Sequence, residues 1–160
     1  MEIKKRHHIR SSKKRDLTEK LKPKLGEEIE EIFEGKVEKA EMEDETIVYL
    51  VENKPLLFKN EGEFIPLIFE ADKLLLKKVV VDMGAVKHVT NGADIMAPGI
   101  IKTDDGIKKE DTVSIEDEEN QKTIAIGKVL ETGMEEKDKG KMIENLHYVG
   151  DDFWELQEKF

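Results

Sequence analysis

The residues of this sequence that are able to do acid–base or metal chemistry are histidines and carboxylates, and none has the spacing of a site. His7-His8 is the one adjacent pair of histidines, and the others are His88 and His147. Adjacent residues of a strand point to opposite faces, and the histidines do not recur at the spacing of a helical metal site. The acidic pairs Asp104-Asp105 and Asp151-Asp152 lie in turn-like segments, where water denies them the burial that shifts a catalytic pKa. The pattern predicts no catalytic residue and no metal ion.

Motifs for covalent chemistry and for nucleotide cofactors are also missing. The chain has no cysteine, which excludes disulfides, thiolate catalysis and cysteine-bound zinc. No serine lies in a nucleophile-elbow context, and no glycine-rich loop ends in Gly-Lys-Ser/Thr. We therefore expect a protein that is not an enzyme and has no cofactor. No apolar run approaches the roughly 20 residues that span a bilayer, so we expect a cytoplasmic protein without a membrane partner.

Basic residues gather at the start of a chain that is acidic as a whole. The formal net charge is −10, yet residues 1–24 hold ten Lys and Arg against three acids. This segment carries +7, which leaves −17 for the rest of the chain (−10 minus +7). A local patch dominates the potential within a Debye length of about 8 Å, so we predict that Lys13, Lys14 and Arg15 contact RNA. The alternative is a solvated helix face beside a chain terminus.

A second set of candidate binding residues lies between residues 80 and 100. Gly84, Gly92 and Gly99 let the backbone approach a partner closely and expose amides to phosphates or ribose hydroxyls. Lys87 and His88 belong to the helix expected in this segment. A rigid rim of amides with a few cations suits the shape-based recognition of RNA. The predicted RNA-binding residues of this segment are Lys87, His88, Asn91, Gly92, Ala93, Asp94, Met96, Pro98 and Gly99.

The glycines also have a structural interpretation, because glycine permits tight packing in a small barrel. We assign Gly84 and Gly127 to packing on this ground. Gly92 follows Asn91 at the expected end of a helix, where a positive φ is needed. A β-branched residue adopts that conformation only at a cost of about 1–3 kcal/mol. Gly92 is therefore expected to be required both for the conformation and for the approach of RNA.

The first half of the chain has the pattern of an α+β structure. Residues 3–10 predict a short strand, and apolar residues from Leu17 to Phe33 recur at three- and four-residue spacing, which indicates one helical face. Ser12 or Asp16 is a candidate N-cap, and Pro23 predicts two short helices or a kink. Segments with β-branched or aromatic residues predict further strands at 37–41, 46–52, 56–59 and, with Pro66 at an edge or a turn, 64–69.

The second half has the pattern of one helix against a small, mostly β barrel. Residues 77–81 are typical of a buried strand. Asp82 is a candidate cap for a helix that runs to Asn91-Gly92, where glycine suits a left-handed exit. Further strands are expected at residues 93–96, 98–101, 111–116, 122–130 and 153–156.

Three segments resemble a known family. Residues 80–100, with Gly84-Ala85, Gly92-Ala93 and the run 96–99 (Met-Ala-Pro-Gly) in order, resemble the opening of a PUA domain, which is named after pseudouridine synthase and archaeosine transglycosylase. Residues 140–154 look like the C-terminus of the malignant-T-cell-amplified protein and its relative ligatin. Residues 54–59 followed by 64–66 look like the pre-PUA domain of the same family.

This resemblance implies the fold class and the domains. We expect an α+β protein in which an α+β pre-PUA domain, residues 1–76 with the basic segment, precedes a mostly β PUA pseudo-barrel, residues 77–160. In that family the protein binds the small ribosomal subunit and influences initiator tRNA placement, reinitiation and recycling.

The resemblance also implies a function and partners. It points to an archaeal RNA-binding protein of translation that contacts structured RNA (rRNA or tRNA). The implied partners are the small ribosomal subunit and an initiation-factor-like protein. Two alternatives stay open, which are a non-catalytic RNA-guiding subunit of a tRNA- or rRNA-modifying enzyme and a protein-interaction module. Co-sedimentation with small ribosomal subunits separates the first function from the other two.

Overall fold

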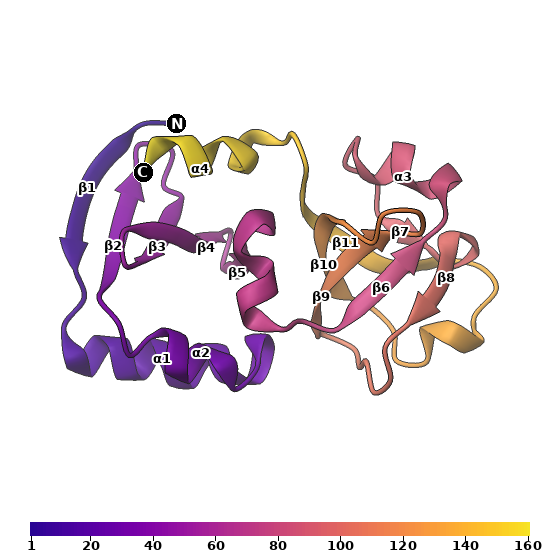
Figure 1. The fold of residues 1–160 in the computed structure, drawn as a ribbon, viewed down its shortest axis with the longest axis horizontal. Helices are drawn as coiled ribbons and strands as arrows, with labels where there is room; N and C mark the ends of the chain where they lie inside the picture. The colour runs from indigo at the N-terminus through magenta and orange to yellow at the C-terminus, as the bar shows by residue number, and fades with distance from the viewer. The chain divides into compact units, whose positions relative to one another are not determined.

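The computed structural model describes all 160 residues, and the chain divides into two compact units (Figure 1). The first unit contains residues 1–75 together with 156–160, and the second contains residues 76–155. The last five residues belong to the first unit because α4 (Leu156–Lys159) packs against its sheet, where Leu156 is buried. Lys159 Nζ also lies 2.9 Å from Glu2 Oε1. None of the helices has the length and apolar character that crossing a membrane requires.

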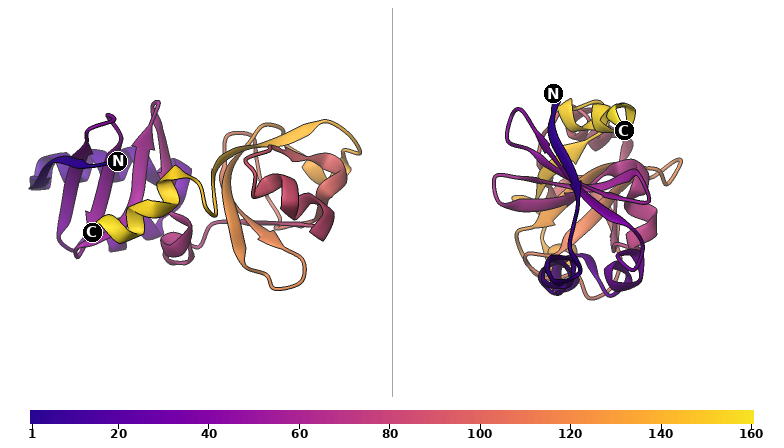
Figure 2. Two further views of the ribbon diagram at one scale, coloured as in Figure 1. Left: turned by 90° about the horizontal axis from the view of Figure 1, so that it is seen from above. Right: turned by 90° about the vertical axis from the view of Figure 1, so that its left-hand side faces the viewer.

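The first unit is built on one antiparallel sheet of five strands in chain order (Figure 2). The predicted strands near residues 3–10, 37–41, 46–52 and 56–59 are confirmed, and Pro66 lies in an edge strand. The strands are β1 (Ile3–His8), β2 (Val37–Met42), β3 (Ile47–Val51), β4 (Lys54–Asn60) and β5 (Glu63–Pro66). Figures 1 and 2 show α1 and α2 on one side of this sheet and α4 on the other.

Two helices follow β1, and they differ from the predicted ones in where they break. They are α1 (Ser11–Leu25) and α2 (Glu28–Ile32), and the turn η1 (Ile68–Leu74) closes the unit. Two short helices are found, as one of the two predictions had it, but the break is not at Pro23. Helix α1 continues through Pro23 to Leu25, and its C-cap is Gly26, whose φ is 96°. Proline removes one hydrogen bond, whereas Leu21 and Leu25 on either side of it are buried and keep the last turn in place.

The N-cap of α1 is also different from the prediction. Arg10 occupies the cap position, and no side chain is hydrogen-bonded to the first amides of the helix. Ser12 and Asp16 both lie inside α1, so neither caps it. The helix therefore begins with free amide groups and without an acidic residue in its first turn.

An ion pair attaches the exposed edge strand β1 to the sheet. Arg6 Nε lies 2.9 Å from Glu38 Oε2, and Arg6 Nη2 lies 3.1 Å from Glu38 Oε1. Glu38 is buried on β2, whereas its partner Arg6 is an exposed residue of β1. The hydrogen bond from Arg6 lowers the pKa of the Glu38 carboxyl. Arg6 also lies over the Phe160 ring, 5.5 Å from its centroid, so the pair connects β1 with the C-terminus.

The sheet of the second unit curls on itself to form a pseudo-barrel, as predicted. Its order is β7-β11-β10-β9-β6-β8, and only β6 and β9 are parallel. The two edge strands β7 and β8 are joined by the three residues of η2, so the edges of the sheet must approach each other. The strands are β6 (Lys78–Val81), β7 (Ile95–Met96), β8 (Ile100–Thr103), β9 (Thr112–Asp117), β10 (Thr123–Val129) and β11 (Lys141–Tyr148). The helices are α3 (Met83–Val89), η2 (Ala97–Gly99), η3 (Met134–Glu136) and η4 (Asp152–Glu155).

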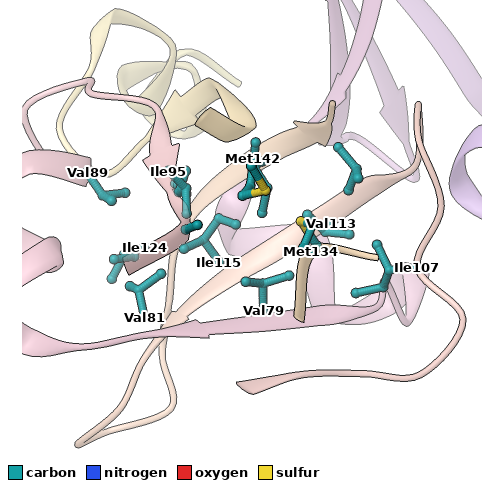
Figure 3. Packing of buried hydrophobic residues seen from close by; sticks show 14 residues of the cluster. Val79, Val81, Val89, Ile95, Ile107, Val113, Ile115, Ile124, Met134 and Met142 are labelled. Carbon is teal, nitrogen blue, oxygen red and sulfur yellow. The ribbon is translucent and has the colours of Figure 1, made fainter. Parts of the chain in front are cut away.

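The core of the second unit is the inside of this barrel (Figure 3). Val79 and Val81 of β6 and Val113 and Ile115 of β9 alternate into it, as the period of two in a strand requires. Val89 enters from α3 and covers one end of the barrel. Full burial of such side chains contributes about 1.5–3 kcal/mol each before conformational entropy is subtracted. The predicted arrangement of one helix against a β barrel is confirmed.

The C-terminal part of this unit corrects two expectations. The strand predicted at residues 153–156 is wrong, since these residues form the end of η4 and the start of α4. The reason is Asp151, whose carboxylate accepts hydrogen bonds from Tyr148 N at 3.0 Å and Trp154 N at 2.9 Å and so caps a helical turn. A short apolar run does not distinguish a helix from a strand by itself. The strand β11, which the sequence pattern does not single out, lies between β7 and β10.

Replacing Glu38 with Gln is expected to destabilise the first unit in a pH-dependent way. The folded-state pKa of Glu38 is depressed, so its pairing stabilises the fold above the unfolded pKa near 4.5 and is lost as the pH falls through the folded value. We expect a loss of about 1 kcal/mol at neutral pH and a smaller loss at an acidic pH below the folded-state pKa. Urea unfolding followed by circular dichroism at the two pH values measures both. Glu34→Gln, at an exposed position, is the control, and an equal loss in it would contradict the assignment.

Gly127→Ala is expected to destabilise the second unit by about 1–3 kcal/mol through overpacking. A Cβ at this position would collide with Ile143 Cγ2 and lie 3.0 Å from the Glu144 carbonyl oxygen on the neighbouring strand β11. Gly84→Ala on α3 is the matched control, and it should change stability by less than about 1 kcal/mol. Trp154 is the only tryptophan and lies in this unit, so its fluorescence during urea unfolding reports both values. Equal stabilities of the two variants would refute the packing role of Gly127.

Candidate functional site

Local signals at both ends of α3 position the candidate site. Asp82 is the N-cap, and its Oδ1 accepts a hydrogen bond from Ala85 N at 2.8 Å, as predicted. After the helix the chain turns at Gly92, whose φ of 94° confirms the predicted left-handed exit. Gly92 N donates to Val89 O and Ala93 N donates to His88 O, each at 3.0 Å. The turn therefore satisfies the last carbonyls of α3 and directs the chain back along the helix into β7.

A cleft of about 520 Å³ lies between α3 and the segment of residues 93–99, with one wall completed by β11. Six of the nine residues predicted in this segment line it, namely His88, Ala93, Asp94, Met96, Pro98 and Gly99. The cleft residues that the sequence did not indicate as binding residues include Ala85, Ile95 and Lys141. Lys141 lies 47 positions after Asp94 along the chain, and no local pattern connects the two.

The other three predicted residues of this segment do not line the cleft. Lys87 and Asn91 are exposed on the surface of α3 and of the turn after it. Gly92 faces the interior of its own unit, because a Cβ there would lie 3.0 Å from the Tyr148 ring. A substitution at Gly92 therefore combines strain in φ with a clash against Tyr148, and it does not isolate an effect on binding.

The glycines of the site have different roles. A Cβ at Gly99 would lie 2.9 Å from Ala85 Cβ, so this glycine permits η2 to pack closely on α3. Gly84 has an ordinary φ, and the nearest atom to a Cβ there is Asp82 Oδ1 at 3.3 Å. Its assignment to packing is therefore wrong, whereas the assignment of Gly127 to packing is confirmed. Gly84 is an exposed helix position that lines the cleft.

The carboxylates of the cleft are already engaged within the protein. Asp82 caps α3, while Asp94 Oδ1 accepts from Asn145 N at 2.8 Å and Asp94 Oδ2 lies 2.9 Å from Lys141 Nζ. The hydrogen bond to Asp94 raises the pKa of Lys141, which keeps its ammonium charged. The remaining lining is largely apolar, and Met96 is 47% exposed. The cleft thus combines a largely apolar lining with carboxylates that are already paired within the protein.

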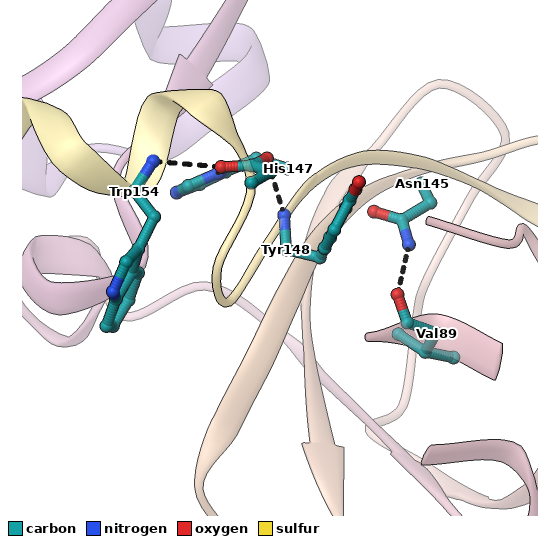
Figure 4. Close-up of polar contacts among 6 residues, drawn as sticks. Val89, Asn145, His147, Tyr148 and Trp154 are labelled. Atoms are coloured by element: carbon teal, nitrogen blue, oxygen red, sulfur yellow. Dashed lines mark hydrogen bonds and ion pairs between the residues drawn. The ribbon is translucent and has the colours of Figure 1, made fainter. Parts of the chain in front are cut away.

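Asn145 of β11 is hydrogen-bonded to both sides of the cleft, and Figure 4 shows its bond to Val89. Its Nδ2 donates to Val89 O, at the end of α3, and to Ala93 O, before β7, both at 3.0 Å. Its backbone amide binds Asp94. One residue therefore connects the helix, the turn and the edge strand. The neighbouring His147 is buried and its Nδ1 lies 2.9 Å from Asp151 Oδ2, which places it in the capping network of η4.

The three basic residues predicted to bind RNA all lie in the first unit, near the start of α1. Lys14 Nζ donates to Gly35 O at 3.2 Å, so this side chain is used to hold the chain after α2. Arg15 is exposed. Lys13 is also exposed and lines a second cleft, of about 430 Å³, within the first unit. The structure therefore separates these three neighbours in sequence into different surroundings.

Comparison with known proteins identifies the class of each unit. Residues 1–74 match the family model of the Pre-PUA-like domain, and residues 77–149 match that of the PUA domain. The chain is 44% identical over 170 aligned residues to an uncharacterized protein of Methanocaldococcus jannaschii, with 98% of this chain and 99% of the relative covered. A crystal structure of a hypothetical protein from Pyrococcus horikoshii has the same fold, with a TM-score of 0.81 and 32% identity over 96% of this chain and 99% of that one.

Two eukaryotic relatives define the family. Translation machinery-associated protein 20 of Schizosaccharomyces pombe is 33% identical, with 91% of this chain and 88% of the relative covered. Malignant T-cell-amplified sequence 1-B of Xenopus laevis is 36% identical over 71% of this chain and 67% of the relative. The chain belongs to the family of two-domain proteins that join a Pre-PUA-like domain to a PUA domain and include these two. The resemblance seen in the sequence is confirmed.

Replacing Asn145 with Asp is expected to destabilise the second unit by about 3 kcal/mol. The change removes both donors from the carbonyls of Val89 and Ala93 and places a carboxylate against them. Asn120→Asp, at an exposed turn, is the matched control and should change stability by less than about 0.5 kcal/mol. Urea unfolding followed by Trp154 fluorescence measures the difference. Similar stabilities of the two variants would show that Asn145 does not hold the cleft.

Proposed function

We propose that this protein binds structured RNA in translation, and that the cleft beside α3 takes an unstacked nucleoside of that RNA. The observation that carries the proposal is the lining of the cleft, where Gly84, Ala85 and Ala93 leave room beside the exposed Met96. A volume of about 520 Å³ falls within the range of sites for small ligands. Small residues and a polarizable thioether suit the face of a base, which stacks regardless of its sequence.

The chemistry of the cleft favours a base over a run of phosphates. Its cation Lys141 is neutralised by Asp94, and Asp82 adds a second carboxylate, so the lining offers no positive potential of its own. Bases inside an RNA duplex cannot enter such a cleft, whereas bases of loops and ends can leave the stack. Lys87, which is exposed on α3, is a candidate for a phosphate next to the bound nucleoside.

The proposed targets are tRNA and the rRNA of the small ribosomal subunit, and an initiation-factor-like protein is a proposed further partner. The name of the yeast relatives, translation machinery-associated protein 20, supports a role beside the translation machinery. The basic segment of the first unit supports a polyanionic partner in a chain whose net charge is −10. Lys13 and Arg15, which are exposed, are proposed to contact phosphates of the RNA.

The test of the proposal is binding of a tRNA transcript and of small-subunit rRNA by the whole protein at several salt concentrations. The affinity should fall as salt rises, with a log–log slope of about −0.7 to −0.9 for each neutralised phosphate. Gly84→Leu should weaken binding at least about tenfold, since its side chain would enter the cleft from an exposed helix position of ordinary φ. Filter binding measures both quantities.

The control for this experiment is Asn120→Leu, which adds the same side chain at an exposed turn outside the cleft. Both variants should unfold at nearly the temperature of the natural protein. A folded Gly84→Leu variant that binds as well as the control would exclude the cleft as the binding site. A natural protein that binds neither RNA at low salt would refute the proposed function.

A further inference from the structure

The second cleft, within the first unit, gathers side chains from every strand of the sheet and from α1. The register of the strands creates this convergence. His7 of β1 lies opposite Lys39 of β2, and Lys39 lies opposite Tyr49 of β3. On the far side Lys59 of β4 lies opposite Phe64 of β5. A row of side chains that are far apart in sequence therefore forms one wall, and α1 forms the other.

The cleft is strongly basic in a protein that is acidic as a whole. Its lining includes five Lys and Arg side chains and one carboxylate, that of Asp16. Among the cations only Lys39 is ion-paired, with Glu41 at 3.6 Å. The others, which have no carboxylate partner in the protein, are Arg10, Lys13, Lys20 and Lys59. Like charges around one concave surface raise its potential and attract anions.

The aromatic floor of the cleft holds two of these cations in place. Lys20 Nζ lies 5.5 Å from the centroid of the Phe64 ring, and Lys59 Nζ lies 5.2 Å from it. Both distances are within the reach of a cation–π interaction, which fixes an ammonium without neutralising its charge. Phe64 thus keeps two positive charges at the cleft and leaves both able to bind an anion.

Tyr49 adds a hydrogen-bond donor at the base of the same cleft. The residue is only 7% exposed, it lines the cleft, and its hydroxyl makes no hydrogen bond within the protein. The hydroxyl oxygen is not among the fully buried atoms, so it is open to an acceptor bound in the cleft. Burial raises the pKa of Tyr49, so the hydroxyl stays protonated and is able to donate at neutral pH.

The start of α1 adds further positive potential beside the cleft. Its cap residue Arg10 and its first-turn residue Lys13 both line the cleft. The first amides of this 15-residue helix have no side-chain cap, and no acidic residue opposes the helix dipole in the first turn. The free amides and the helix dipole favour a negatively charged ligand, as the basic side chains of the cleft do.

We propose that this cleft of the first unit is a phosphate-binding site, in which Arg10, Lys13, Lys20 and Lys59 bind the phosphate oxygens and the Tyr49 hydroxyl donates a hydrogen bond. The inference rests on the proposed function only in taking RNA as the source of the phosphate. It assigns phosphate binding to the first unit and base binding to the cleft beside α3.

The first experiment uses inorganic pyrophosphate and does not depend on RNA. The whole protein is titrated at constant ionic strength while its amide resonances are followed by NMR, and residues lining the cleft should shift. The triple variant Lys13→Gln, Lys20→Gln and Lys59→Gln should lose at least about tenfold in affinity. Tyr49→Phe removes only the hydroxyl oxygen and should weaken binding severalfold while the protein stays folded.

The control is a triple variant that also removes three positive charges, but from exposed positions of the first unit outside the cleft. It carries Lys5→Gln, Lys36→Gln and Lys54→Gln. This variant should bind pyrophosphate almost as the natural protein does. Equal losses in the two triple variants, or no shift at the cleft in the natural protein, would overturn the proposal whether or not the protein binds RNA. A failure of RNA binding with pyrophosphate binding intact would overturn the proposed function alone.

The second experiment distinguishes the two sources of phosphate in RNA. Binding of a tRNA transcript with a 5′-phosphate is compared with that of the same transcript with a 5′-hydroxyl. The triple variant Lys13→Gln, Lys20→Gln and Lys59→Gln is the cleft variant. If removing the 5′-phosphate lowers the affinity of the natural protein but not that of the cleft variant, the site binds a chain end. If the natural protein binds both transcripts equally well, and the magnitude of the salt slope is smaller by about 2 in the cleft variant than in the control triple variant, the site binds backbone phosphates. A cleft variant with the salt slope of the control overturns the proposal for RNA phosphates.

Discussion

The three residues of η2 join the two edge strands of the second sheet, and this short connection constrains the rest of the unit. It forces β7 and β8 to approach each other, so the sheet has to curl around its apolar side chains. It is also bonded to α3, because Asp82 N donates to Gly99 O at 2.9 Å and Gly99 packs against Ala85. The helix is thereby held beside the segment of residues 93–99, and the candidate cleft is the space that remains between them.

The two clefts of this protein differ in their chemistry, and the difference follows from how their charges are paired. In the second unit the carboxylates of Asp82 and Asp94 are bound to a backbone amide and to Lys141, which leaves an apolar lining. In the first unit most of the lining cations have no carboxylate partner. The Phe64 ring holds two of them in place, and the start of α1 adds further positive potential. An acidic protein is in this way able to present one strongly positive surface, which its net charge of −10 does not reveal.

Much of the fold was predictable because local chemistry determines it. The capping of α3 by Asp82 and the left-handed exit at Gly92 depend on residues that are neighbours in the chain. The strands of the first sheet follow from their β-branched and aromatic residues. The failures have physical reasons of the same kind. Residues 153–156 form helical turns because one side chain, Asp151, caps them. Helix α1 continues past Pro23 to Leu25 because the burial of Leu25 outweighs the hydrogen bond lost at Pro23.

The sequence by itself determined the family, the two domains it implies, the basic character of residues 1–24 and half of the residues lining the cleft beside α3. The tertiary structure alone decided which residues face which. It set Gly92 against Tyr148, paired Asp94 with Lys141 and aligned His7, Lys39 and Tyr49 across three strands. The physical reason is that helix caps and turns form between neighbours in the chain, whereas strand register is set by the packing of residues tens of positions apart.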